Sequence, residues 1–129
     1  MIDPNPLDVL MSSKYLRLTT FRRDGRPVAT PVWMVRDGEA LLVTTTTTTG
    51  KVKRLRHTPR VLLAPCDRRG LVAEGMTDVE GTGEVLTDEA SLSRLDQLLR
   101  RRYGLLYRMI AWMPRRGEAQ TCCLRLTVG

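Results

Sequence analysis

The sequence has no apolar run that approaches the roughly 18 residues needed by a membrane-spanning helix. Its first residues, Met1 to Pro6, have neither the basic start nor the apolar stretch of a secretory signal. We therefore expect a cytoplasmic protein with no membrane span.

Cysteine and histidine are also scarce. The chain has Cys66, Cys122, Cys123 and a single His57. An odd number of cysteines with two adjacent is a poor basis for a disulfide framework, so we expect reduced thiols. No Cys-x-x-Cys or His-x-x-x-His spacing offers zinc ligands, so no metal site is expected. Neighbouring residues on a strand point to opposite faces, which predicts that only one of Cys122 and Cys123 is buried.

Motifs for side-chain catalysis are missing as well. The sequence contains no Gly-x-Ser-x-Gly, no recognisable pair of catalytic carboxylates and no Cys–His arrangement. We therefore predict no catalytic side chain, and His57, close to Pro59, is interpreted as a surface or helix-end residue.

Aromatic residues make up only 5% of the chain, whereas basic residues are abundant. Lysine and arginine number 21 against 14 acidic residues, which gives a formal net charge of +7. Such a balance favours an anionic partner. Nucleic acid is a remote alternative, because no aromatic residue lies among the cations between Lys51 and Arg60 to stack on bases.

The rest of the composition is that of one folded domain covering residues 1–129, with 42% hydrophobic and 27% charged residues. The patterning predicts a leading helix at Pro6 capped by Asn5, and strands over residues 14–21, 28–35 and 40–45 joined by Asp-Gly turns. It then predicts a helix over 50–58, a strand over 60–65, a loop over 66–78, a strand over 79–86, helices over 87–104 and 105–113, and a strand over 121–128.

These elements predict an α+β protein, mainly β, built as a small antiparallel barrel with helices at its rim. The strand over 28–35 is apolar on both faces. We expect the barrel interior to cover one face, and a helix or another subunit to cover the other.

The most informative segment runs from Thr44 to Arg60. Six consecutive threonines lead into Gly50 and a helix that carries four cations and no acid. A helix N-terminus offers free N–H groups and partial positive charge, and nearby cations deepen the attraction for phosphate. The segment therefore predicts an anion site, with an edge strand and a solvated basic helix face as the alternative. It matches neither the P-loop nor the dinucleotide-binding pattern.

Four motifs in order resemble the pyridoxamine 5′-phosphate oxidase-like split β-barrel superfamily, in particular its actinobacterial branch that depends on coenzyme F420. They are residues 14–21 with the Asp24-Gly25 turn, residues 30–33, the threonine tract with residues 50–56, and residues 59–67. The resemblance covers roughly residues 10–86. It implies a homodimer of six- to seven-stranded antiparallel split barrels with short helices, and cofactor sites at the subunit interface.

The resemblance also implies hydride transfer between a reduced deazaflavin, coenzyme F420, and a conjugated small-molecule substrate, with FMN as the alternative cofactor. By motif position, Lys51 and Arg54 are the main phosphate ligands and Lys53 is the next candidate. Hydroxyl and backbone contacts fall to Thr46, Thr47, Thr48, Thr49 and Gly50. The ring would lie along Thr30, Pro31, Val32 and Trp33.

Two alternatives stay open beside this assignment. Trp33 is also interpretable as a bulky core or interface residue. The same fold also suits a non-catalytic protein that binds or sequesters a cofactor, because a fold does not fix a function.

Overall fold

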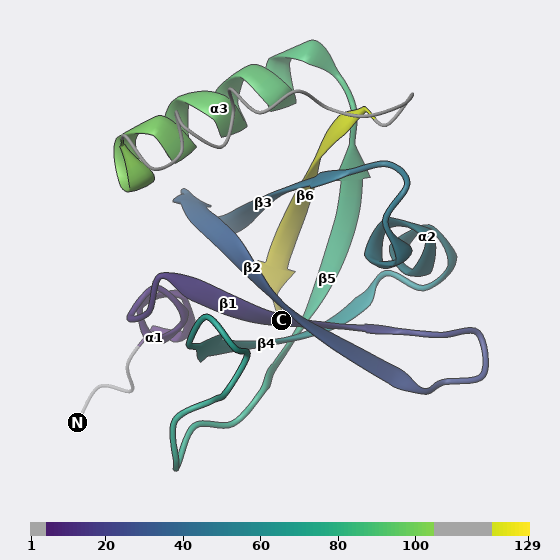
Figure 1. Cartoon of the computed structure of the whole chain (residues 1–129), viewed down its shortest axis with the longest axis vertical. Helices are drawn as coiled ribbons and strands as arrows, with labels where there is room; N and C mark the ends of the chain where they lie inside the picture. The colour runs from purple at the N-terminus through teal and green to yellow at the C-terminus, as the bar shows by residue number, and fades with distance from the viewer. Residues whose placement is uncertain (1–4, 105–119) are drawn as a thin grey trace.

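The computed structural model describes residues 5–104 and 120–129, and in that part of the chain a closed antiparallel barrel dominates (Figure 1). The barrel has the strand order β1-β2-β3-β6-β5-β4. Its strands are β1 (Tyr15–Phe21), β2 (Pro27–Asp37), β3 (Ala40–Thr46), β4 (Arg60–Cys66), β5 (Val79–Leu86) and β6 (Thr121–Val128). The helices are α1 (Pro6–Leu10), α2 (Gly50–His57) and α3 (Glu89–Tyr103).

The expected fold class is confirmed. Both Asp-Gly turns form, since Gly25 and Gly38 adopt φ values of 89° and 61°, which side-chain-bearing residues rarely accept. The predicted helix over 105–113 lies outside the described residues.

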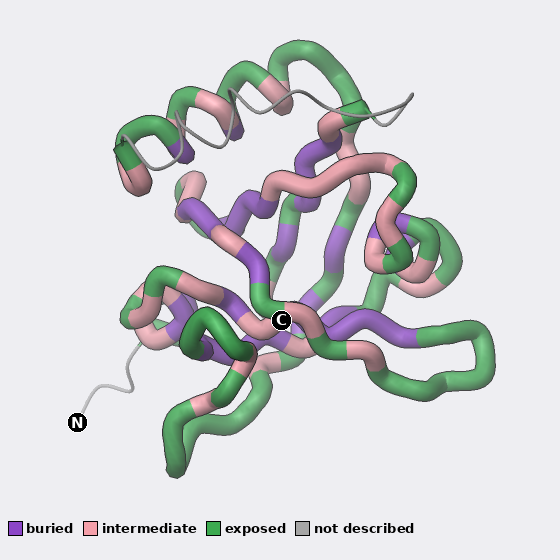
Figure 2. Tube along the Cα trace, viewed as in Figure 1, coloured by how far each residue is buried: buried purple, intermediate pink, exposed green. Residues whose placement is uncertain are grey.

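Aliphatic side chains from the strands form the core of the barrel. Figure 2 shows that the strands of the barrel contain most of the buried segments. Two helices contribute to this core: α1 through Leu7 and Leu10, and α2 through Val52 and Leu55. The strand residues are Leu16, Leu18, Val32, Met34, Leu41, Val43, Val61, Leu63, Cys122, Leu124 and Leu126. This packing fixes the start of α2 against the barrel, where the anion site is expected.

A second, smaller core lies outside the barrel under α3. Leu95 and Leu99 of this helix pack on Val35, Leu42 and Cys123. The prediction that only one of the adjacent cysteines is buried is therefore wrong: Cys122 faces the barrel interior and Cys123 faces α3. The sequence pattern of one strand cannot show that a distant helix covers its outer face.

The expectation for the outer face of β2 holds over part of the strand. Val35 is covered by α3, whereas Ala29 and Pro31 remain exposed. Among the described residues, no helix has the length and apolar character needed to cross a membrane.

Candidate functional site

β2 has different strand partners along its length. Residues 27–33 pair with β1, and residues 34–37 pair with β3. The threonines at the end of β3 pair with β6. The two strands β2 and β3 therefore separate after the Met34–Val43 pair. Among residues 5–104 and 120–129, no strand pairs with this side of β2 over residues 27–33. Because alternate residues of a strand direct their backbone polar groups to each side, N–H and C=O groups lie along this edge.

The four residues predicted to lie along the ring are divided between the two faces of β2. Thr30 and Val32 oppose the interior residues Leu18 and Leu16, and Val32 belongs to the barrel core. Pro31 and Trp33 therefore lie on the outer face. Only these two place side chains outside the barrel, where a flat ring has access.

The hydroxyl of Thr30 is buried in the barrel wall. Among the described residues it has no hydrogen-bond partner. A buried hydroxyl without a partner costs about 1–3 kcal/mol of stability.

Trp33 is held from one side by the last residue of α3. Its ring stacks on Tyr103 with centroids 4.5 Å apart and planes 11° from parallel. The Tyr103 hydroxyl accepts from the Met34 N–H (3.1 Å), and its single proton has two acceptors within reach, the carbonyl oxygens of Lys14 (2.8 Å) and Met34 (2.9 Å). One face of the indole is thus taken by protein, which fixes the position of Trp33.

The predicted threonine contacts form a strand end and a turn. Thr46 closes β3, and the turn is held by the Thr49 hydroxyl, which donates to the Thr46 carbonyl at 3.0 Å. Hydroxyl oxygens also pair between Thr45 and Thr49 (3.2 Å) and between Thr46 and Thr48 (3.4 Å). Thr47 is fixed through its backbone N–H, which donates to the Gln120 carbonyl. The tract therefore presents a preformed, hydroxyl-rich entry to α2.

The N-terminus of α2 lacks a side-chain cap. Thr49 occupies the N-cap position, but its hydroxyl is turned back to the strand and makes no cap hydrogen bond. The first N–H groups of the helix are therefore open to another acceptor. The absence of a side chain at Gly50 also matters, because a Cβ there would lie 2.6 Å from Arg54 Nη1. Glycine lets this guanidinium lie over the start of the helix.

A pocket of about 470 Å³ lies between this helix start and the β1–β2 hairpin. The helix and the hairpin project from the same side of the barrel (Figure 1). We call it the basic pocket; it is lined by Phe21, Arg22, Arg23, Gly50, Lys53, Arg54 and His57. No acidic residue is among these lining residues. The Arg54 Nε donates to the hydroxyl of the fully buried Thr20 at 2.6 Å, which orients the guanidinium. The pocket therefore has the charge and the fixed donors of an anion site.

Burial and neighbouring charge lower the pKa values of two cations here. The pKa of Arg54 is lowered by burial and then by the charge of Arg22. The pKa of Lys51 is lowered by burial and then by Arg54, while Cys122 acts in the opposite direction. An anion bound between Arg54 and Arg22, both in the pocket lining, would relieve their mutual repulsion.

The structure separates the predicted phosphate ligands. Gly50, Lys53 and Arg54 meet in the basic pocket, whereas Lys51 is half-buried and does not line it. Four lining residues were not predicted as site residues: Phe21, Arg22, Arg23 and His57. The adjacent arginines before the Asp24-Gly25 turn were the available signal, because two neighbouring cations raise the local positive potential.

The remaining nucleophile candidates are poor ones. Burial raises the pKa values of the Cys66 and Cys122 thiols and raises that of Cys123 to about 11. Among the described residues, no three His, Cys, Asp or Glu side chains gather as metal ligands.

Comparison with known proteins agrees with this architecture. The model of the family described as Pyridoxamine 5′-phosphate oxidase matches residues 2–127. Similar solved structures include an F420 reductase (TM-score 0.68, 23% identity, covering 99% of this chain and 96% of that one). A heme storage protein from Vibrio cholerae (0.71, 15%, 95% and 87%) and a FAD-binding protein from Mesorhizobium loti (0.67, 20%, 98% and 91%) are also similar. No curated protein sequence matches the chain closely enough to count as a relative.

Proposed function

Because the chain belongs to the pyridoxamine 5′-phosphate oxidase family, we propose that it is an oxidoreductase that uses a phosphorylated flavin-type coenzyme. Coenzyme F420 is the coenzyme we favour, and FMN is the alternative. The single observation that carries the proposal is the basic pocket at the uncapped start of α2.

The residues of the basic pocket fit a phosphate group. Open N–H groups at the helix start and the oriented Arg54 guanidinium supply directed donors. Lys53 and Arg22 add positive charge from the helix and from the facing hairpin. In this proposal the threonine hydroxyls support the turn, and Lys51 contributes to the field from outside the pocket.

The open edge of β2 fits the ring. Backbone N–H and C=O groups beside Pro31 and Trp33 can pair with the polar edge of a flat heterocycle. Trp33, braced by Tyr103, limits where that ring can lie. When bound, a reduced deazaflavin supplies a hydride; the protein's part is to orient the ring and exclude water.

The charge of the basic pocket favours F420 over FMN. Arg22, Arg23, Lys53 and Arg54 supply four positive charges without an acidic neighbour in the lining. A phosphate monoester such as that of FMN offers only about −1.5 to −2. The surplus suits a coenzyme whose phosphate is followed by further carboxylates, as in the glutamyl tail of F420. The similar F420 reductase is in keeping with this choice.

We also propose that the chain works as a homodimer with cofactor sites at the subunit interface. The exposed Ala29 and Pro31 leave half of the outer face of β2 without cover. A second copy is the partner that the family resemblance suggests for this face.

A non-catalytic binding protein is the second candidate, supported by the likeness to a heme storage protein. The two functions differ in turnover, not in the binding site.

Titration with F420 and with FMN, followed by tryptophan quenching, tests which coenzyme the protein binds. A Trp112→Phe variant leaves Trp33 as the one tryptophan reporter. We expect tighter binding of F420. Tighter FMN binding would reverse the choice, and tight binding with no turnover of conjugated acceptors would favour the carrier.

A further inference from the structure

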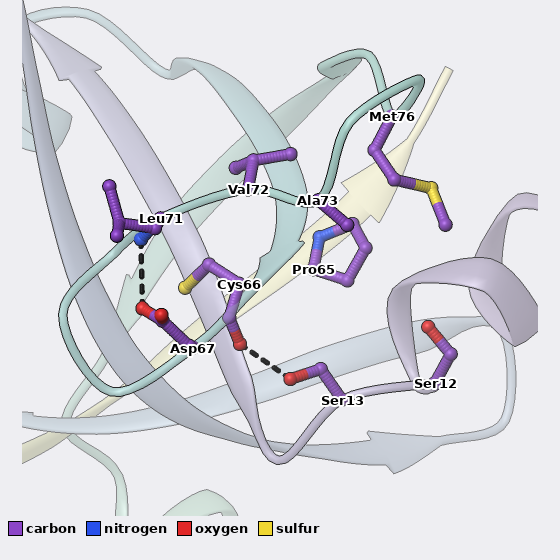
Figure 3. A pocket seen from close by; sticks show the side chains of 9 residues that line it. All are labelled: Ser12, Ser13, Pro65, Cys66, Asp67, Leu71, Val72, Ala73 and Met76. Atoms are coloured by element: carbon purple, nitrogen blue, oxygen red, sulfur yellow. Dashed lines mark hydrogen bonds between the residues drawn. The ribbon is translucent and has the colours of Figure 1, made fainter.

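A second pocket of about 450 Å³ lies on the outer side of the barrel, at the end of β4 (Figure 3). We call it the loop pocket, because the connection between β4 and β5 forms one wall and the α1–β1 turn forms another. Its lining residues are Ser12, Ser13, Pro65, Cys66, Asp67, Leu71, Val72, Ala73 and Met76. The volume is within the range of small-molecule sites.

The wall formed by the loop is fixed by its own hydrogen bonds. Asp67 Oδ1 accepts from the N–H groups of Arg69 (2.8 Å) and Leu71 (2.9 Å), and Val72 forms a β-bridge with Cys66. On the opposite wall, the Ser13 hydroxyl donates to the Cys66 carbonyl (Figure 3). The pocket is therefore preformed and does not need to be ordered by its ligand.

This fixed loop nevertheless holds two large apolar side chains in solvent. Leu71 is 65% exposed and Met76 is 41% exposed, and both line the pocket. The two side chains lie at opposite ends of the loop that borders the pocket (Figure 3). A mostly apolar lining is typical of small-molecule sites. Both side chains offer contact area to an apolar ligand.

The loop pocket adjoins the strand on which the coenzyme ring is proposed to lie. Tyr15 is paired with Trp33 on one side and with Cys66 on the other. Paired residues of neighbouring strands share a face, so Cys66 and Trp33 lie on the same side of the sheet with Cα atoms about 10 Å apart. The loop also approaches the ring strand directly, since a Cβ at Gly70 would lie 3.7 Å from Pro31 Cδ.

The two pockets have opposite charge character. None of the residues that line the loop pocket is basic, and its one charged residue is Asp67. The basic pocket has several cations and no acid. An anionic group is therefore drawn to the start of α2, while the loop pocket accepts neutral or cationic apolar molecules.

We propose that the loop pocket binds the organic substrate, a neutral or cationic and largely apolar molecule. This inference rests on the proposed function, because the substrate must reach the ring beside Trp33. In the reduction, the substrate gains a hydride and a proton, and the reduced coenzyme loses the same hydride and a proton as it is oxidised. Ser12 and Asp67 are the polar groups that orient the substrate at the rim.

The test uses the neutral dye Nile red with the full chain and no coenzyme. Wild-type protein is expected to bind the dye with a fluorescence increase, and a Leu71→Ser/Met76→Ser double variant is expected to bind it about tenfold more weakly, because both apolar contacts are lost. Arg68→Ser, on the same loop but outside the lining, is the matched control and is expected to bind normally. Both substituted side chains are exposed, so thermal unfolding of the double variant should remain that of the wild type.

A second dye separates this inference from the proposed function. Binding of the anionic dye 8-anilinonaphthalene-1-sulfonate is expected to weaken in the Arg54→Gln variant and to be unchanged in the double variant. Loss of coenzyme binding in Arg54→Gln with unchanged Nile red binding would support both assignments. Equal Nile red binding by wild type and double variant would overturn the loop pocket while leaving the coenzyme site standing. Conversion of a dimer to a monomer by the double variant, seen in sedimentation velocity, would make this surface a subunit interface and also overturn the proposal.

Discussion

Replacing Arg54 by glutamine removes the best-positioned cation of the basic pocket. The wild-type guanidinium lies over Gly50 and is oriented by its hydrogen bond to Thr20, so little ordering is needed when an anion binds. We expect the Arg54→Gln variant to bind the phosphorylated coenzyme much more weakly than the wild type.

The size of the effect follows from the kind of contact. A hydrogen bond to a charged group contributes about 1.5–3 kcal/mol, which corresponds to a loss of about 10- to 150-fold in affinity. Lys53 is exposed on the same helix, so we expect Lys53→Gln to cause a smaller loss.

The assay is a fluorescence titration of each variant with coenzyme at low and at moderate ionic strength. The wild-type dissociation constant is expected to rise with salt, because charges more than about 10 Å apart are screened near 0.1 M. Arg56→Gln is the matched control, since it removes the same charge from an exposed position on α2 outside the pocket. We expect it to change affinity by less than about twofold.

Two outcomes would refute the reasoning. Equal losses in Arg54→Gln and Arg56→Gln would show that only general attraction is measured, and not a site. A larger loss in Lys51→Met than in Arg54→Gln would place the phosphate nearer Lys51 than the residues that line the basic pocket.

Three further predictions concern stability. Tyr103→Phe removes the hydroxyl that joins the ends of β1 and β2. The variant should lower the free energy of unfolding in urea by about 1–3 kcal/mol and shift the fluorescence emission of Trp33. Unchanged stability would contradict a role for that hydroxyl. Burial raises the pKa of Cys123 from 9.0 to about 11. The contribution of the protonated thiol to the free energy of unfolding is therefore complete below pH 9, and about 2–3 kcal/mol of stability is lost as pH rises toward 11. Denaturant titrations from pH 8 to 11 should show this decline in the wild type and a flatter profile in Cys123→Ala; parallel profiles would argue against it. Gly81→Ala should destabilise the barrel by about 1–3 kcal/mol, because its Cβ would overlap the Thr127 carbonyl oxygen; a wild-type melting temperature would refute that contact.

Most of the fold was predictable from local signals. Alternating apolar residues placed the strands, and the two Asp-Gly pairs placed the hairpin turns at the glycines with positive φ. The start of α1 was marked by Pro6 after Asn5. For α3 the sequence offered Thr87 or Asp88 as the cap, and the structure uses Asp88, whose carboxylate accepts from the Ser91 N–H at 3.0 Å. Each of these signals acts within a few residues along the chain, so the sequence pattern contains it directly.

The candidate site was predictable only in part. The start of α2 was found from its glycine and cations, but Arg22, Arg23 and His57 entered the basic pocket only with the structure. The strand pattern could not show that Thr30 and Val32 face the barrel interior, because β2 is apolar on both faces and its register was undetermined.

The sequence by itself determined the class of fold, the order of the strands along the chain and the basic helix that begins at Gly50, because periodicity, turn residues and caps act locally. Only the tertiary structure decided that Lys51 lies outside the pocket, that Cys123 is covered by α3, and that Tyr103 braces Trp33. These contacts join residues far apart in sequence, and they depend on barrel closure and helix packing, which no local pattern specifies.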